Sequence, residues 1–213
     1  MGTIRKGALG GFSGKAGSII GSSWRDISYI KGLPKLSNKP KSEKQLEQQA
    51  RFAMAIRFLL PVKDYLTVGF NDLKQGRSTG FNVALKNLLE KAVTGLYPAL
   101  EINYPLAEYS RGPLSGPAAV VVTPETGKLV ITWANDVLKA TSHTDDELVV
   151  LVYEPGSNDY VVGPPSALRS AGIVDVVMPA DWASLAVHVY VYFISKTGER
   201  VSNSIYAGSA IVL

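Results

Sequence analysis

Cysteine is absent from this chain of 213 residues, and histidine is scarce, with only two present. The lack of cysteine excludes disulfides, thiolate metal ligands and a cysteine nucleophile, and it leaves the redox compartment undetermined. His143 and His188 are too few for the usual zinc sites. We therefore expect neither a bound metal ion nor a cofactor.

Long hydrophobic runs are also missing. The most apolar window, AMAIRFLLPV, includes Arg57 and Pro61, whereas a membrane-spanning helix needs about 20 mostly apolar residues. The opening MGTIRKGALGG lacks the apolar core and small-residue cleavage site of a secretory signal. We expect no membrane span, and we expect cytoplasmic synthesis without a signal peptide. The product then joins an assembled particle or is exported by a route without a cleaved signal.

No motif for catalysis is present. The stretch GGFSGKA resembles a phosphate-binding loop, but Gly10 and Gly14 are too close together, and Ala16 replaces the magnesium-binding hydroxyl. Residues 143–147, HTDDE, lack the ligand spacing of a calcium loop and are expected to form a solvated loop. No G-x-S-x-G motif occurs. We therefore expect that the protein is not an enzyme.

The composition is that of a globular protein, with 46% apolar and 19% charged residues. The net charge of +4 is unevenly distributed. Residues 1–100 hold 16 Lys or Arg and 6 Asp or Glu, a net charge of +10, whereas residues 101–213 hold 6 and 12, a net charge of −6. This asymmetry indicates either a nucleic-acid partner for the basic half or attraction between unlike parts of neighbouring subunits.

Residues 1–41 predict an extended, glycine-rich, basic arm. Their many glycines, and the prolines of LPKLSNKPK at 33–41, disfavour helix. The pieces SIIGSS and WRDISYI can each form a short strand. Because an isolated hairpin is marginally stable in water, we expect these strands to lie on another surface, within the chain or in a second copy.

Residues 42–98 predict a bent helical hairpin. The first helix begins near Ser42, and Pro61 should kink or break it. Its expected apolar face consists of Leu46, Ala50, Ala53 and Leu60 and is widened by Phe52, Ile56 and Leu59. A second segment covers VKDYLTVGFNDL, and a third covers FNVALKNLLEKAV, with Gly95 as a stop signal.

Residues 99–213 predict a β-domain, because apolar and polar residues alternate in short segments rich in Val, Ile, Thr and Tyr. These segments are EINYPLAEY, AAVVVTPE, KLVITWA, ELVVLVYEP, YVVGP, GIVDVVMP, LAVHVYVYFIS and VSNSIYAGSAIVL. Turn signals such as P-E-T-G and P-G-S-N-D separate them. The seven or eight expected strands are typical of an immunoglobulin-like or fibronectin type III-like β-sandwich. Trp133 is the expected core tryptophan. The fold class is therefore α+β, with an arm, a helical segment and a sandwich.

The strongest candidate site is the basic and aromatic set in the first hundred residues. Aromatic and aliphatic residues of the arm are expected to contact a neighbouring subunit, because such residues dominate interfaces. This subunit-contact set is Phe12, Ile19, Ile20, Trp24 and Tyr29. The cations around them form an expected basic patch of Lys15, Arg25, Lys31, Lys35, Lys41, Lys44 and Arg51. Interleaved cations and aromatics are also typical of single-stranded nucleic-acid binders.

The order GGFSGKAGSIIGSSWRDISYI, then KLSNKPKSEKQLEQQARFAMA, then ISKTGERVSNSIYAGS resembles an uncharacterised bacterial family with a GGFSGK-VG-GSSWKG-like opening. That resemblance implies no activity. The piece KPKSEKQLEQQARF also resembles an N-P-R-T-P-A-Q-x-A-x-R-x-x-F segment of bacteriophage structural proteins, with matches at Pro40, Gln45 and Phe52.

We expect a structural, self-assembling protein, such as the subunit of a filament, tube or phage-like particle, in which the arm contacts the next copy. The partner is then the protein itself, in a homo-oligomer. A nucleic-acid-binding protein with a basic N-terminal half is the alternative. A carbohydrate-binding or adhesive β-sandwich is a weaker one.

Overall fold

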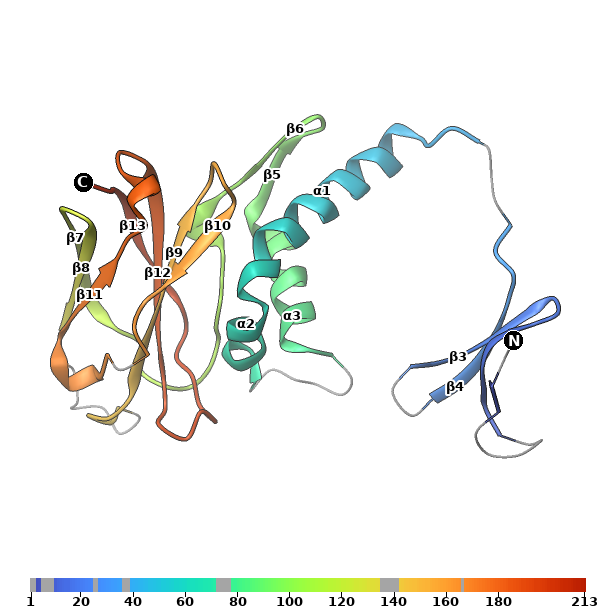
Figure 1. The fold of residues 1–213 in the computed structure, drawn as a ribbon, viewed down its shortest axis with the longest axis horizontal. Helices are drawn as coiled ribbons and strands as arrows, with labels where there is room; N and C mark the ends of the chain where they lie inside the picture. The colour runs from blue at the N-terminus through green and yellow to red at the C-terminus, as the bar shows by residue number, and fades with distance from the viewer. Residues whose placement is uncertain are drawn as a thin grey trace. The chain divides into compact units, whose positions relative to one another are not determined.

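A computed structural model of the chain describes residues 3–4, 10–24, 27–35, 39–71, 78–134, 142–165 and 167–213. The chain divides into two compact units, Met1–Ser42 and Glu43–Leu213, which are described separately below. Figure 1 shows the elements along the chain. The structure is mixed and mostly β.

The N-terminal unit is a four-stranded antiparallel sheet. Its strands are β1 (Thr3–Ile4), β2 (Phe12–Ala16), β3 (Ile19–Trp24) and β4 (Ile27–Gly32), and they lie in sequence order. The expected strands in SIIGSS and WRDISYI are β3 and β4. The expectation of an extended arm is corrected, because the GGFSGKA stretch supplies a partner strand, β2, and Gly17, with a φ of 60°, turns the chain back into β3.

Two glycines allow close contacts between neighbouring segments of this sheet. A Cβ on Gly21 would lie 2.3 Å from the carbonyl oxygen of Phe12 and 2.6 Å from its ring, and a Cβ on Gly11 would lie 2.1 Å from Ser28 Oγ. No larger residue fits at either position without moving the backbone. The glycines therefore serve contacts within the N-terminal unit.

The second unit begins with helices. They are α1 (Glu43–Leu59), a 3-10 turn (Leu60–Val62), α2 (Lys63–Gly69) and α3 (Gly80–Asn87), which continues as a π-helical turn (Leu88–Ala92). The predicted break at Pro61 is confirmed. The predicted apolar face of α1 is only partly right. Leu59 is buried and Ile56 is partly buried, but Leu46, Phe52 and Leu60 are exposed. The other buried residues of α1 are Ala55 and Phe58.

A β-hairpin follows the third helix. Strands β5 (Val93–Leu96) and β6 (Ala99–Ile102) pair antiparallel, and a short 3-10 turn covers Tyr104–Leu106. Gly95, with a φ of 86°, lies inside β5, where a Cβ would be 2.3 Å from the carbonyl oxygen of Ala99. It therefore shapes the hairpin, whereas the sequence predicted a helix stop.

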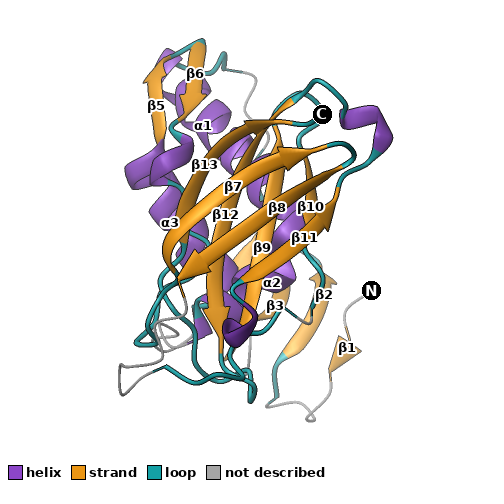
Figure 2. Cartoon of the chain, turned by 90° about the vertical axis from the view of Figure 1, so that its left-hand side faces the viewer, coloured by secondary structure: helices purple, strands orange, loops and turns teal. Residues whose placement is uncertain are grey.

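Two larger sheets form the rest of the unit. The strands are β7 (Ala118–Glu125), β8 (Lys128–Ala134), β9 (Glu147–Glu154), β10 (Asp159–Val162), β11 (Ile173–Val177), β12 (Ala186–Ile194) and β13 (Ile205–Ile211). One sheet has the order β10-β9-β12-β13 and the other the order β11-β8-β7, with all pairs antiparallel (Figure 2). Each predicted segment from AAVVVTPE onward therefore contains a strand.

The β10-β9-β12-β13 sheet, called the four-stranded sheet of the second unit below, is buried on both faces. Val150, Val189 and Phe193 point to the three-stranded sheet and share a core with Ile131 and Trp133, as in a β-sandwich. Leu151, Tyr153 and Tyr192, which alternate with them, pack against Phe58 and Leu66 of the helices. Trp133 is 5% exposed, as predicted for a core residue. The helical segment and the sheets share this packing and form one unit, where the sequence predicted separate parts divided at residue 98.

Candidate interaction surface

Strand register brings the exposed aromatic residues of the N-terminal sheet onto one face. Trp24 is paired with Ile27, Ser22 with Tyr29, and Ile20 with Lys31 across β3 and β4. Residues paired across an antiparallel ladder lie on the same face of a sheet, as do residues two positions apart in one strand. Lys15 of β2 joins this face through its pairing with Ile20. We call Lys15, Ile20, Trp24, Ile27, Tyr29 and Lys31 the aromatic face.

The aromatic face is open to solvent within its own unit. Trp24 is 53% exposed, Ile27 45% and Tyr29 42%, and Ile20 is partly buried. All six residues of β4 are exposed, and β4 is an edge strand of the described sheet. Its outer N–H and C=O groups are therefore available for pairing with another strand.

The structure divides the predicted subunit-contact set between two faces. Ile20, Trp24 and Tyr29 lie together, whereas Ile19 pairs with Gly32 on the opposite face and Phe12 packs over Gly21. Ile30, at 63% exposure, also lies on that opposite face, directly across from Gly21. The sequence indicated the residues of this set as contact residues, but it did not reveal the strand pairing that places them on two different faces of the sheet.

The residues of the predicted basic patch belong to both units. Lys15 and Lys31 lie on the aromatic face, Lys35 is exposed beyond the end of β4, and Arg25 lies outside the described residues. Lys41 precedes α1, and Lys44 and Arg51 lie within α1. Arg51 Nη1 lies 3.3 Å from Glu47 Oε1, and Arg51 Nη2 donates to the carbonyl oxygen of Val93 at 2.8 Å. Arg51 therefore stabilises the contact between α1 and β5.

A buried ion pair replaces part of the solvated loop that the sequence predicted at residues 143–147. Asp146 and Arg169 are each 1% exposed, and Arg169 Nε donates to Asp146 Oδ2 at 3.0 Å. The guanidinium also lies 3.7 Å from the ring centroid of Phe193 and donates to the carbonyl oxygen of Ser115. Hydropathy cannot identify such a pair, because both side chains are polar and their partners are distant in sequence.

In the second unit, a cluster of aromatic side chains lies between the helices and the β10-β9-β12-β13 sheet. The ring of His188 stacks on that of Tyr104, with centroids 3.8 Å apart, and His188 Nδ1 lies 2.8 Å from Tyr206 Oη. Burial lowers the pKa of His188 below its ordinary value. The hydroxyls of Tyr109 and Tyr160 form a hydrogen bond of 2.8 Å, and burial raises the pKa of both. These hydrogen bonds give the cluster a structural role.

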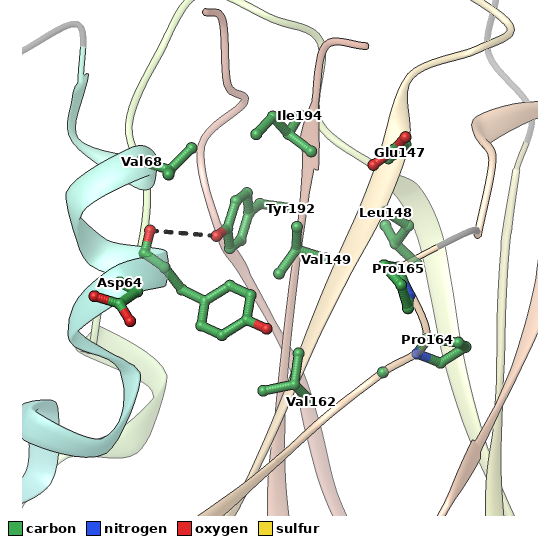
Figure 3. Close-up of a pocket in the computed structure, with 12 residues that line it drawn as sticks. Asp64, Val68, Glu147, Leu148, Val149, Val162, Pro164, Pro165, Tyr192 and Ile194 are labelled. Carbon is green, nitrogen blue, oxygen red and sulfur yellow. Dashed lines mark hydrogen bonds between the residues drawn. The ribbon is translucent and has the colours of Figure 1, made fainter. Parts of the chain in front are cut away.

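One pocket, of about 430 Å³, opens between α2 and the four-stranded sheet (Figure 3). Asp64 and Val68 line it from α2, Tyr192 and Ile194 from β12, and Pro164 and Pro165 from the segment after β10. The remaining lining residues are Tyr65, Glu147, Leu148, Val149, Val162 and Gly163. Tyr192 Oη donates to the carbonyl oxygen of Tyr65 at 3.5 Å, and burial raises the pKa of this phenol. The pocket is mainly apolar, with two carboxylates among its lining residues.

Among the residues that the structure describes, no three His, Asp or Glu side chains gather closely enough to hold a metal ion. None of the helices in that part of the chain has both the length and the apolar character needed to cross a membrane.

The fold and surfaces define a mostly β protein with an exposed sheet face and an unassigned apolar pocket. A family model described as a family of unknown function (DUF6266) matches residues 11–208, and the chain belongs to that family. The expectation of an uncharacterised family is thereby confirmed. No curated protein and no solved structure matches the chain.

Proposed function

We propose that this protein is a structural, self-assembling subunit that contacts its neighbours through the aromatic face of the N-terminal sheet. The observation that carries the proposal is the alignment of Trp24, Ile27 and Tyr29 on one face, each more than 40% exposed. Burying a large apolar side chain is worth about 1.5–3 kcal/mol. A partner surface over these three residues therefore supplies a substantial part of the affinity needed for stable association.

A second copy of the chain is the partner that the charges favour. Residues 1–42 hold 8 Lys or Arg and 1 Asp or Glu, a net charge of +7, whereas residues 43–213 hold 14 and 17, a net charge of −3. Opposite net charges promote encounter between the N-terminal unit of one copy and the second unit of another. Such a contact joins unlike surfaces, and unless the rotation closes into a ring it extends into a filament or tube. A non-enzymatic role is part of this proposal.

The test is the mass of the native protein by light scattering over a concentration series. The full chain should form species larger than one chain, and Trp24→Ala should shift the equilibrium towards single chains more than Lys15→Ala does. A full chain that stays a single molecule at the highest concentration would refute the proposal.

Nucleic-acid binding is a second candidate, because Lys15 and Lys31 lie on the same face as Trp24 and Tyr29. Aromatic platforms beside cations are the arrangement that binds single strands. Release of counterions would make the affinity fall steeply with salt, whereas a contact anchored by Trp24 should depend less on salt. A gel-shift series with single- and double-stranded DNA at two salt concentrations tests this candidate, and no binding at low salt removes it.

We also propose that the two larger sheets form a sandwich of the fibronectin type III kind. The fourth strand of the set, β10, pairs with the third, β9. In the constant-type immunoglobulin arrangement the fourth strand lies instead beside the fifth, in the opposite sheet. An experimental structure that retains β10 beside β9 would support this assignment.

A further inference from the structure

The β5–β6 hairpin projects past the sheets at one end of the second unit (Figure 1). Arg51 Nη2 and the backbone N–H of Asn103 hold its base through the carbonyl oxygens of Val93 and Ala92, each at 2.8 Å. Only glycine fits at Gly95, since a Cβ there would lie 2.3 Å from a backbone oxygen. The hairpin is therefore built into the fold and needs little ordering before it binds.

The tip of this hairpin is apolar. Leu96 is 84% exposed and Tyr97 is 44% exposed. Residues 92–100, AVTGLYPAL, contain no charged side chain. Removing this tip from water therefore requires no desolvation of a charge. A single exposed leucine is ordinary on a protein surface, but adjacent Leu and Tyr side chains on a fixed projection can anchor in a pocket.

The pocket beside α2 lies at the other end of the same unit. In Figure 1 and in the turned view of Figure 2, α2 and the hairpin tip are at opposite ends of the sheets. The pocket volume of about 430 Å³ falls within the range of about 300–1,000 Å³ typical of sites that enclose a ligand. Val68, Val149 and Val162 supply apolar lining that suits a leucine or tyrosine side chain.

We propose that the hairpin tip of one copy, Leu96 and Tyr97, inserts into the pocket beside α2 of the next copy. Because tip and pocket lie at opposite ends of one unit, they cannot meet within a chain. The contact joins two different surfaces, so repeating it adds copies head to tail. This inference rests on the proposed self-assembly and gives it a second contact, separate from the aromatic face.

The test uses complementary variants of the full chain in a Trp24→Ala, Tyr29→Ala background, which weakens the contact through the aromatic face. Leu96→Ser removes the apolar anchor of the tip, and Val68→Arg obstructs the pocket. Val68 is 36% exposed near the C-terminal end of α2, where a cation is favourable. A neutral substitution at position 96 avoids an ion pair with Asp64 or Glu147 of the pocket and with the cation introduced by Val68→Arg. Val177→Arg, at a 75% exposed position on β11, is the matched control.

Sedimentation velocity should show association of the background protein and of the Val177→Arg control, and single chains for each of the other two variants. Mixing those two should produce pairs, because the intact tip of Val68→Arg can enter the intact pocket of Leu96→Ser. Circular dichroism checks that each variant is folded. Unchanged association of either variant, or a mixture that remains single chains, would overturn the inference. A background protein that is monomeric while the wild type assembles refutes this contact alone, whereas a monomeric wild type refutes the proposed function as well.

Discussion

Arg169 Nε and Asp146 Oδ2 are 3.0 Å apart, in a pair from which water is almost completely excluded. Removing one partner of a buried pair leaves an uncompensated charge and typically costs about 3–5 kcal/mol. Asp146→Ala should therefore lower the free energy of unfolding by about that amount in urea denaturation. Asp145→Ala is the control, because its ion pair with Lys196 is long, at 3.8 Å, and exposed. Equal effects of the two substitutions would contradict a stabilising role for the buried pair.

His188 makes stability depend on pH. Burial lowers its pKa in the folded protein, so the unfolded chain binds a proton more readily. The free energy of unfolding should therefore decrease as the pH falls below about 6.5, the ordinary histidine pKa, and this contribution should level off below the folded pKa. Urea denaturation at several pH values measures the effect, which should be smaller in His188→Gln. An equal pH dependence in His188→Gln and the wild type would contradict this role of His188.

Gly21→Ala should disrupt the N-terminal sheet, because the added Cβ would overlap the carbonyl oxygen of Phe12. Gly32→Ala is a matched control in the neighbouring strand, since no atom lies within 4 Å of the corresponding Cβ. Hydrogen exchange of backbone amides should show lost protection in β2 and β3 for Gly21→Ala, with the second unit unaffected. Retained protection in those strands would show that the close packing of Gly21 and Phe12 is not required.

The alternation of side chains made the larger sheets predictable. In β7 and β8 the more buried and more exposed positions alternate along the strand, and these strands match the predicted segments AAVVVTPE and KLVITWA. Pro61 was equally informative, because proline cannot donate the backbone hydrogen bond that would continue α1. Local patterns of this kind depend only on the sequence within each segment.

Contacts between distant segments were not predictable from such patterns. The stripe containing Leu46 is apolar but exposed, because tertiary packing instead buries the face of α1 that carries Ala55 and Phe58. The glycine-rich start was predicted to be an arm because the sequence pattern did not reveal the pairing of β2 with β3. In the structure, Gly17 forms the turn between these strands and Gly21 leaves room for Phe12. The aromatic face likewise exists only because the register pairs Trp24 with Ile27.

Deletion of residues 1–36 tests whether the N-terminal sheet has a role beyond stability. These residues lie within a unit distinct from Glu43–Leu213, so the truncated protein should keep the two larger sheets folded. Near-ultraviolet circular dichroism can follow the buried Trp133 and Trp182 as reporters of that core. Its assembly should be weaker than that of the full chain at equal concentration. A truncated protein that associates as strongly would show that the N-terminal sheet is not a subunit contact.

Copies of this chain should associate through the aromatic face, and light scattering of the wild type and Trp24→Ala at matched concentrations measures that association. Trp24 is the largest exposed side chain of that face, and its loss should raise the concentration needed for association by about tenfold or more, the equivalent of about 1.4 kcal/mol. Lys15→Ala should have a smaller effect. A wild type that scatters as a single chain throughout, or a Trp24→Ala variant that associates like the wild type, would refute association through this face.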